Sequence, residues 1–217
     1  LQGNGTLEAT VAKQRIDATL TADFPLIGLH HFMTMEDTLD LGAALTLNAA
    51  TRPDLEALAL DGSLSNIRFL TPRQSVTMKD IAFAFGTSPD TTHAQVKSGD
   101  FDLSLRGHAG LGRISERVGR FTTLLAQQLD ERRLDQEALK HQLPRLSLHV
   151  SAGRENPVSR FIAMKGIDID SVNLNVNADP LVGLNGTSKL FTLRTGGLQL
   201  DDISFRIAQD SNGVKMN

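Results

Sequence analysis

The chain contains no cysteine, no tryptophan and no tyrosine among its 217 residues. Without cysteine it can form no disulfide or zinc–thiolate site, and it has no thiol nucleophile. All ten aromatic residues are phenylalanine, whereas sites for single-stranded nucleic acid stack bases on several aromatic rings. The formal net charge is −3, which argues against a nucleic-acid partner because such surfaces are basic.

Long apolar runs are absent as well. No stretch is long enough to span a bilayer, and no basic segment followed by an apolar one marks a signal peptide. The sequence starts at Leu1, and both ends already show alternating apolar and polar residues. We therefore expect a segment of a longer protein, with any targeting or anchoring part outside it.

Alternation of apolar and polar residues is what the sequence does contain, and it predicts strands with one apolar face. Eight or more such strands at close spacing in the first 110 residues indicate a mainly β fold, either a long sheet or a solenoid. A break in the alternation near Asn66 predicts a bulge. The positions expected on the apolar face include Leu7, Ala9, Val11, Ile16, Ala18, Leu20, Leu41, Ala43, Leu45, Leu47, Ile81, Phe83, Phe85, Ile203, Phe205 and Ile207.

One strand pattern occurs twice. Ile81 and Phe83, preceded by Asp80, return in altered form as Ile203 and Phe205, preceded by Asp202. Repeated strand units must stack on neighbours to bury their apolar faces. We interpret the two copies as strands that present phenylalanine to the same interior.

Residues 111–142 depart from the alternation. Apolar side chains at helical spacing predict two helices, or one helix kinked near Asp130, and Pro144 ends the stretch. The apolar stripe either packs on the sheet or forms a movable lid over an apolar groove. The expected organisation is one continuous domain with a β segment over 1–110, a helical insert over 111–142 and a β segment over 143–217. Shorter helices are expected at 25–33 and 157–164.

Candidate catalytic or metal-binding residues are few. The adjacent pair His30 and His31 is a poor bidentate site, since neighbouring side chains diverge. Asp168 and Asp170 share a strand face and could bind a hard cation, although a solvated outer face explains them better. No nucleophile elbow or phosphate-binding loop is present. The sequence thus predicts no enzyme, no metal and no cofactor.

Six segments before and after the helical stretch carry a family resemblance: Ser98-Gly99-Asp100-Phe101-Asp102-Leu103, Leu143-Pro144-Arg145-Leu146-Ser147-Leu148, Ala152-Gly153-Arg154-Glu155-Asn156-Pro157, Gly183-Leu184-Asn185-Gly186, Leu200-Asp201-Asp202-Ile203-Ser204-Phe205 and Gln209-Asp210. Together these segments resemble a central segment of the TamB-type proteins of Bacteroidetes, the large subunit of the translocation and assembly module. Upstream, Pro53-Asp54-Leu55-Glu56 and Leu60-Asp61-Gly62-Ser63-Leu64 are similar to the broader AsmA-like superfamily.

The resemblance implies a large periplasmic protein anchored at the inner membrane by an N-terminal helix outside this segment. It implies a long curved, antiparallel or mixed sheet forming a trough or taco-like solenoid with an apolar interior. The expected function is non-enzymatic: phospholipid transport between inner and outer membranes, outer-membrane protein assembly, or both. The expected partners are phospholipid acyl chains, unfolded outer-membrane protein strands and an outer-membrane assembly protein. The sixteen apolar positions named above would then line the lipid-binding groove.

The helical insert departs from the simple trough of the superfamily, so the sequence leaves open whether the groove is open or filled. The alternative to a trough is a closed-core β scaffold, or a protein-binding module of the cell envelope.

Overall fold

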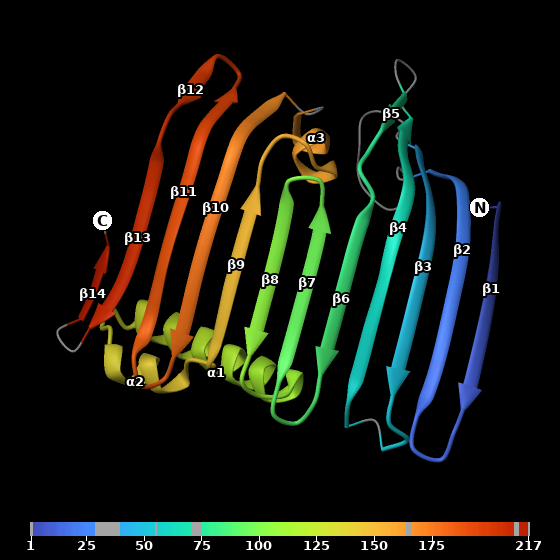
Figure 1. Ribbon diagram of the computed structural model, residues 1–217. Helices are drawn as coiled ribbons and strands as arrows, with labels where there is room; N and C mark the ends of the chain where they lie inside the picture. Colours follow the sequence, from blue (N-terminus) through green and yellow to red (C-terminus); the bar gives the residue numbers. More distant parts are fainter. Residues whose placement is uncertain are drawn as a thin grey trace.

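A single antiparallel sheet contains all fourteen strands of the described residues in the computed structural model (Figure 1). The structure describes residues 2–28, 40–54, 56–70, 75–163, 166–210 and 213–216. The strand order is β1-β2-β3-β4-β6-β7-β8-β9-β10-β11-β13-β14, with β5 paired to β4 and β12 paired to β11. The strands are β1 (Gln2–Val11), β2 (Ile16–Gly28), β3 (Asp40–Thr51), β4 (Leu58–Leu70), β5 (Ser75–Thr77), β6 (Ile81–Thr87), β7 (Thr92–Ser98), β8 (Phe101–Gly107), β9 (Leu146–Ala152), β10 (Ile167–Asp179), β11 (Gly183–Thr195), β12 (Leu198–Leu200), β13 (Ile203–Asp210) and β14 (Gly213–Met216).

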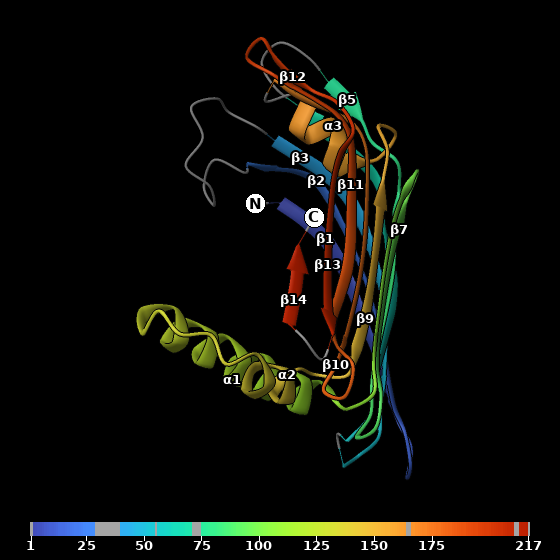
Figure 2. The same cartoon turned by 90° about the vertical axis from the view of Figure 1, so that its left-hand side faces the viewer.

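The predicted mainly β class and open-sheet architecture are confirmed. Each main strand pairs with the next strand along the chain, and the sheet does not close on itself: β1 and β14 lie at opposite edges (Figure 1). Viewed from the side, the sheet is strongly curved, with a concave and a convex face (Figure 2). The curvature gives the sheet the shape of a trough.

Irregularities in two strands fall close to where the sequence breaks its alternation. Asn66 has a positive φ of 54°, and the β3–β4 register shifts between Gly42 and Ala44, so the predicted bulge is confirmed. The β2–β3 register shifts between Phe24 and Ile27. The helix expected over 25–33 is therefore wrong for residues 25–28, which belong to β2. Pro25 is tolerated there because a bulge does not require its missing N–H. The rest of that expected helix, including His30 and His31, lies outside the described residues.

Two helices, α1 (Leu111–Asp130) and α2 (Gln136–Gln142), occupy the predicted insert. They form a helical hairpin that projects from one end of the strands on the concave side (Figure 2). The Asp135 carboxylate caps α2 by accepting a hydrogen bond from the Ala138 N–H at 3.0 Å. Arg117 of α1 donates to the carbonyls of His141 and Leu143 at 3.4 and 3.2 Å, which joins α1 to the end of α2.

A short helix, α3 (Pro157–Ala163), lies at the opposite end of the strands, also on the concave side (Figure 2), close to the range expected for it. Asn156 caps it, accepting from the Ser159 N–H at 2.9 Å. The same side chain, only 1% exposed, donates to the Asp100 carboxylate at 2.8 Å. Asn156 therefore ties the helix to the β7–β8 turn.

The buried core is very small for a chain of this length. Among the described residues, only seven apolar residues are buried, and the one cluster that they form consists of Ala43, Ile67 and Met78. The accessible surface is 14011 Å², compared with about 9,800 Å² expected for a compact monomer of 23.5 kDa. A single curved layer explains the excess, since its concave face has no second layer over it among the described residues (Figure 2).

Within the part of the chain that the structure describes, no helix combines the length and apolar character needed to cross a bilayer.

Candidate binding surface

The concave face of the sheet is identified by three contacts with the helices. The side chain of Ile114 in α1 packs over Gly107 of β8. The amide of Gln209 in β13 donates to the Gln136 carbonyl of α2 at 3.3 Å. The ring of Phe161 in α3 lies 5.8 Å from that of Phe69 in β4. All three helices lie on the concave side, so Gly107, Gln209 and Phe69 point to the concave face. Residues that share a sheet face with them also point there.

Cross-strand pairing arranges the concave face in rows, since directly paired residues in an antiparallel sheet point to the same side. Two apolar rows run side by side across the sheet from β1 to β13. The first row is Leu7, Leu20, Leu47, Gly62, Phe83, Val96, Leu103, Val150, Leu174, Ser188 and Phe205, and the second is Ala9, Ala18, Ala49, Leu60, Phe85, Ala94, Leu105, Leu148, Val176, Gly186 and Ile207.

The two copies of the repeated pattern meet in these rows. Phe83 and Phe205 belong to the first row, and Phe85 and Ile207 to the second. The interpretation that both copies face one interior is confirmed in that geometric sense. Phe83 also lies over Gly62, where an added Cβ would come 2.8 Å from the ring.

All sixteen apolar positions predicted from the alternation lie on this concave face. Nine belong to the two rows, and the other seven extend the apolar surface along the strands. Val11 pairs with Ile16, Leu45 pairs with Ala22, and Leu41 pairs with Phe69 near the buried cluster. Many of them remain partly exposed: Leu7 is 70% exposed and Phe205 is 44% exposed. They are brought together as a continuous surface, and no helix or strand of the described residues covers its middle (Figure 2).

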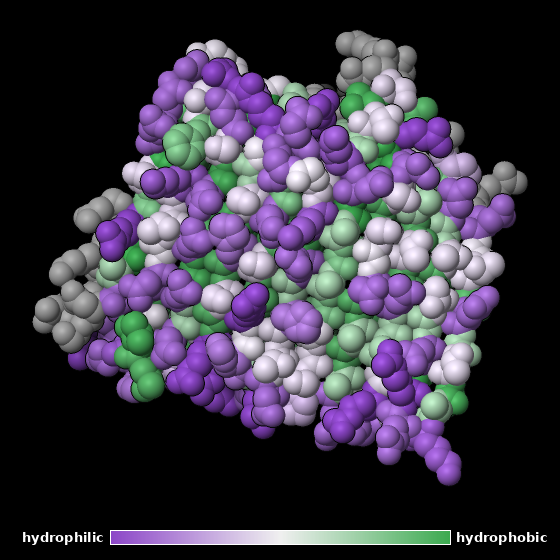
Figure 3. Space-filling view, viewed as in Figure 1, coloured by the Kyte–Doolittle hydropathy of each residue, from purple (hydrophilic) through white to green (hydrophobic). Residues whose placement is uncertain are grey.

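The convex face is polar. Between the two apolar rows, the intervening positions point the other way and form the row Glu8, Thr19, Asn48, Asp61, Ala84, Gln95, Ser104, His149, Asn175, Thr187 and Arg206. Side chains in this row bond across strands: Asn48 accepts from Thr19 at 3.1 Å and donates to Asp61 at 3.0 Å. Figure 3 shows this face, where hydrophilic side chains predominate over much of the surface.

The carboxylates at 168 and 170 are engaged by arginines. Arg194 lies 3.1 Å from Asp168, and Arg154 contacts both Asp168 and Asp170. Two guanidinium groups against two carboxylates leave a balanced cluster, which explains these residues better than a cation does. Among the described residues, no three histidine or acidic side chains gather as they would around a metal ion.

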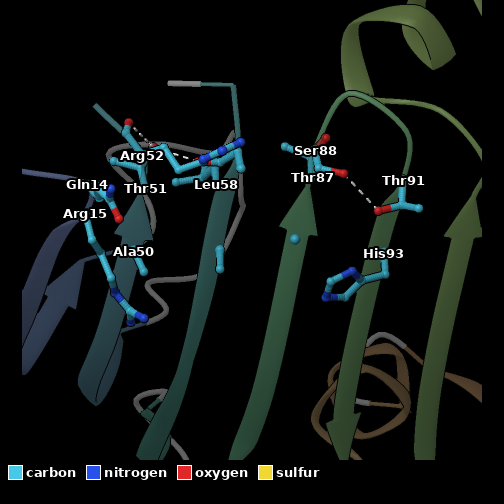
Figure 4. A pocket seen from close by; sticks show the side chains of 13 residues that line it. Gln14, Arg15, Ala50, Thr51, Arg52, Leu58, Thr87, Ser88, Thr91 and His93 are labelled. Carbon is cyan, nitrogen blue, oxygen red and sulfur yellow. Dashed lines mark hydrogen bonds between the residues drawn. The ribbon is translucent and has the colours of Figure 1, made fainter. Parts of the chain in front are cut away.

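A notch of about 320 Å³ lies at the strand ends near the helical hairpin, between the β3–β4 and β6–β7 turns (Figure 4). Small residues line it on the convex side, Ala50, Ala59 and Gly86, and the His93 ring lies over Gly86. Arg15 borders the notch and holds Asp17 through two hydrogen bonds of 2.7 and 2.9 Å. Sequence reasoning missed this notch, because alternation identifies faces and not gaps between turns.

Perturbed carboxyl groups lie at turns, away from the apolar rows. Partial burial raises the pKa of Asp100, but hydrogen bonds from Asn156 and the Glu155 N–H outweigh it, and the pKa is lowered from its usual value. A hydrogen bond from the Leu181 N–H lowers the pKa of Asp179. These shifts belong to turn and cap geometry, and sequence alone gave no sign of the Asn156–Asp100 contact.

The described residues thus form one apolar surface that no helix or strand among them covers in its middle (Figure 2). No protein-family model, curated protein or solved structure matches this chain.

Proposed function

We propose that this chain is a non-enzymatic segment of an apolar trough that binds the acyl chains of phospholipids and takes part in moving them between the inner and outer membranes. The observation that carries the proposal is the pair of apolar rows across the concave face, which no second layer covers in the part of the chain that the structure describes. Exposed apolar patches of this extent mark binding surfaces in water-exposed proteins. The periplasmic location and the membrane anchor outside this segment rest on the resemblance to TamB-type proteins.

The energy available on such a face is sufficient for lipid binding. A methylene group removed from water contributes about 0.8 kcal/mol when fully buried. A chain of roughly sixteen methylenes with one side against the sheet would gain about half of that per group, on the order of 6 kcal/mol. The polar convex face offers no comparable gain in free energy, so lipid would bind only to the concave face.

Between acyl chains and unfolded outer-membrane protein strands, the face favours acyl chains. The backbone N–H and C=O groups of the inner strands are hydrogen-bonded in cross-strand ladders, and the two rows carry almost no polar side chains. A polypeptide laid on this surface would leave its own backbone groups unpaired, which costs several kcal/mol per group. A hydrocarbon chain has no such groups to satisfy.

Site-specific photo-crosslinking to phospholipid tests the proposal. A photoreactive residue replaces Leu47 or Phe83 on the concave face, and a matched one replaces Thr46, the convex neighbour of Leu47. With diacyl phospholipid dispersed in mild detergent, we expect labelling at Leu47 and Phe83 at least tenfold above Thr46. Equal labelling at the three positions would contradict the proposal.

An apolar dye separates the trough from the alternative of a closed-core scaffold. An open concave face binds 8-anilinonaphthalene-1-sulfonate in the native state, and phospholipid displaces the dye. A native protein that binds no dye would favour the closed scaffold or a protein-binding module.

A further inference from the structure

A pocket of about 410 Å³ lies at the end of the strands where α3 packs, and we call it the α3 pocket. Arg160 of α3 lines it, together with Val76 of β5 and with Asp168 and Ile169 of β10. Val76 pairs with Phe69, whose ring lies against α3 on the concave side (Figure 2). The α3 pocket therefore belongs to the concave face, and its volume is typical of sites for small molecules.

Charged side chains of both signs line the α3 pocket. Arg160 lies 2.8 Å from Glu155, and Arg154 lies 3.5 Å from Asp168. These two arginines and two carboxylates give the lining a net charge of zero. Each of the four side chains is between 45% and 61% exposed. Exposed ion pairs contribute little to stability, so a charged ligand can replace one partner of each pair at low cost.

The apolar surface of the trough reaches the α3 pocket along β10. Leu174 belongs to the first apolar row, and Val172 and Asp168 follow it toward the pocket on alternate positions of the strand. Asp168 pairs with Arg194 and Val172 with Leu190 of β11, in one unshifted register. Hydrocarbon thus gives way to charge along a single strand. A ligand that lies across this boundary needs an apolar part joined to a charged part.

The charges of the α3 pocket discriminate among headgroups. Guanidinium groups bind phosphate through paired N–H donors, and carboxylates accept hydrogen bonds from an ammonium group. A lining with no net charge suits a headgroup that carries one charge of each sign, whereas the two carboxylates would repel a purely anionic one. A quaternary ammonium has no N–H to donate and is bound by aromatic cages. Among the described residues that line the pocket, none is aromatic.

We propose that the α3 pocket binds the phosphoethanolamine headgroup of a phospholipid. Arg154 and Arg160 hold the phosphate, and Glu155 and Asp168 accept hydrogen bonds from the ammonium group. The acyl chains extend from the pocket over Val172 onto the apolar rows. This inference rests on the proposed function and adds to it a headgroup site and a preference among phospholipids.

Calorimetric titration of the whole chain with short-chain lipids tests the preference. Dihexanoyl phosphatidylethanolamine should bind about tenfold more tightly than dihexanoyl phosphatidylglycerol, because only the first supplies donors to the carboxylates. Free phosphoethanolamine should bind at least about tenfold more weakly than the ethanolamine lipid, since it buries no acyl chain. Free phosphoethanolamine that binds as tightly as the lipid would overturn the placement of the acyl chains over Val172.

Two variants test the two halves of the headgroup separately. Asp168→Asn should bring the two lipids to within twofold of each other, because the ammonium loses a charged acceptor. Arg160→Gln should weaken binding of both lipids about fivefold, because the phosphate loses a charged donor. Arg106→Gln makes the same change on the convex face, next to Leu105 of the second apolar row, and should leave both affinities within twofold.

The two variants act at different elements, β10 and α3, so one of them remains informative if the other fails to fold. Equal affinity of wild type for the two lipids would overturn the headgroup site, as would a preference that survives in Asp168→Asn. Crosslinking of phospholipid at Leu47 and Phe83 would persist in either case. Loss of that crosslinking would instead contradict the proposed function, so the two failures are distinguishable.

Discussion

Replacing Asn156 by alanine should cost this protein about 2.5 kcal/mol of stability at neutral pH. The side chain is 1% exposed, accepts from the Ser159 N–H at 2.9 Å and donates to Asp100 at 2.8 Å. Loss of the helix cap costs about 1 kcal/mol. Loss of a hydrogen bond to a charged carboxylate costs about 1.5 kcal/mol more. Because the bonds join α3 to the β7–β8 turn, the change should also loosen that end of the trough.

Urea unfolding at two pH values measures this cost. With a slope of about 2.5 kcal/mol per molar urea, the midpoint should fall by about 1 M at pH 7. The pKa of Asp100 is lowered in the folded state, so its contribution is present above the unfolded value of 3.8 and is lost as pH falls through the folded value. The difference between wild type and variant should therefore shrink below pH 3.8.

The conservative variant Asn156→Asp separates the two parts of the effect. Its carboxylate can still accept from the Ser159 N–H, but it cannot donate to Asp100 and repels it when both are charged. We expect destabilisation at pH 7 that largely disappears in acid. A midpoint for Asn156→Ala within 0.2 M of wild type, unchanged with pH, would refute this account of the clamp.

Three further outcomes are expected. Ile67→Ala should lower the free energy of unfolding by about 2–5 kcal/mol, measured by urea titration, because Ile67 is 2% exposed in the one buried cluster. Gly62→Val should reduce native-state dye binding and lower stability, since its Cβ would meet the Phe83 ring at 2.8 Å and the neighbouring strand's backbone; Gly112→Ala, in open space on α1, is the control. The Leu181 N–H lowers the folded pKa of Asp179, so Asp179→Asn should weaken the protein above pH 3.8 and make little difference in stronger acid, as followed by pH titration of the unfolding midpoint.

The sequence was sufficient to predict the sheet and its apolar face because strands have a period of two. Once the face of Leu45 or Phe83 is known, every second residue follows. The bulge at Asn66 was visible for the same reason. The helix expected over 25–33 was wrong at residues 25–28, because crowded apolar residues resemble a helix as much as a bulged strand and only pairing with β3 decides between them.

Other features depend on contacts that no local pattern encodes. The alignment of Ala49 with Ala18 and Ala9 needs the register of three strands, since Ala49 lies well beyond the β1–β2 hairpin. The direction in which the 111–142 hairpin projects depends on where Ile114 and Gln209 touch their partners. The cap at Asn156 joins residues 56 positions apart. Composition and residue spacing predict none of these three features.

The single-layer design has a consequence for how the molecule comes apart. Nearly all extensive contacts join a strand to its neighbour in the sheet, apart from α1 with α2 and α3 with β10. Such a chain behaves like a one-dimensional array, in which each unit is supported by two neighbours and by little else. Opening should begin at the two edge strands, β1 and β14, each of which has one partner strand among the described residues, and move inward strand by strand. Amide exchange would then record a gradient of protection across the sheet. A substitution that destabilises one strand would lower the protection of its neighbours and have little effect on more distant strands.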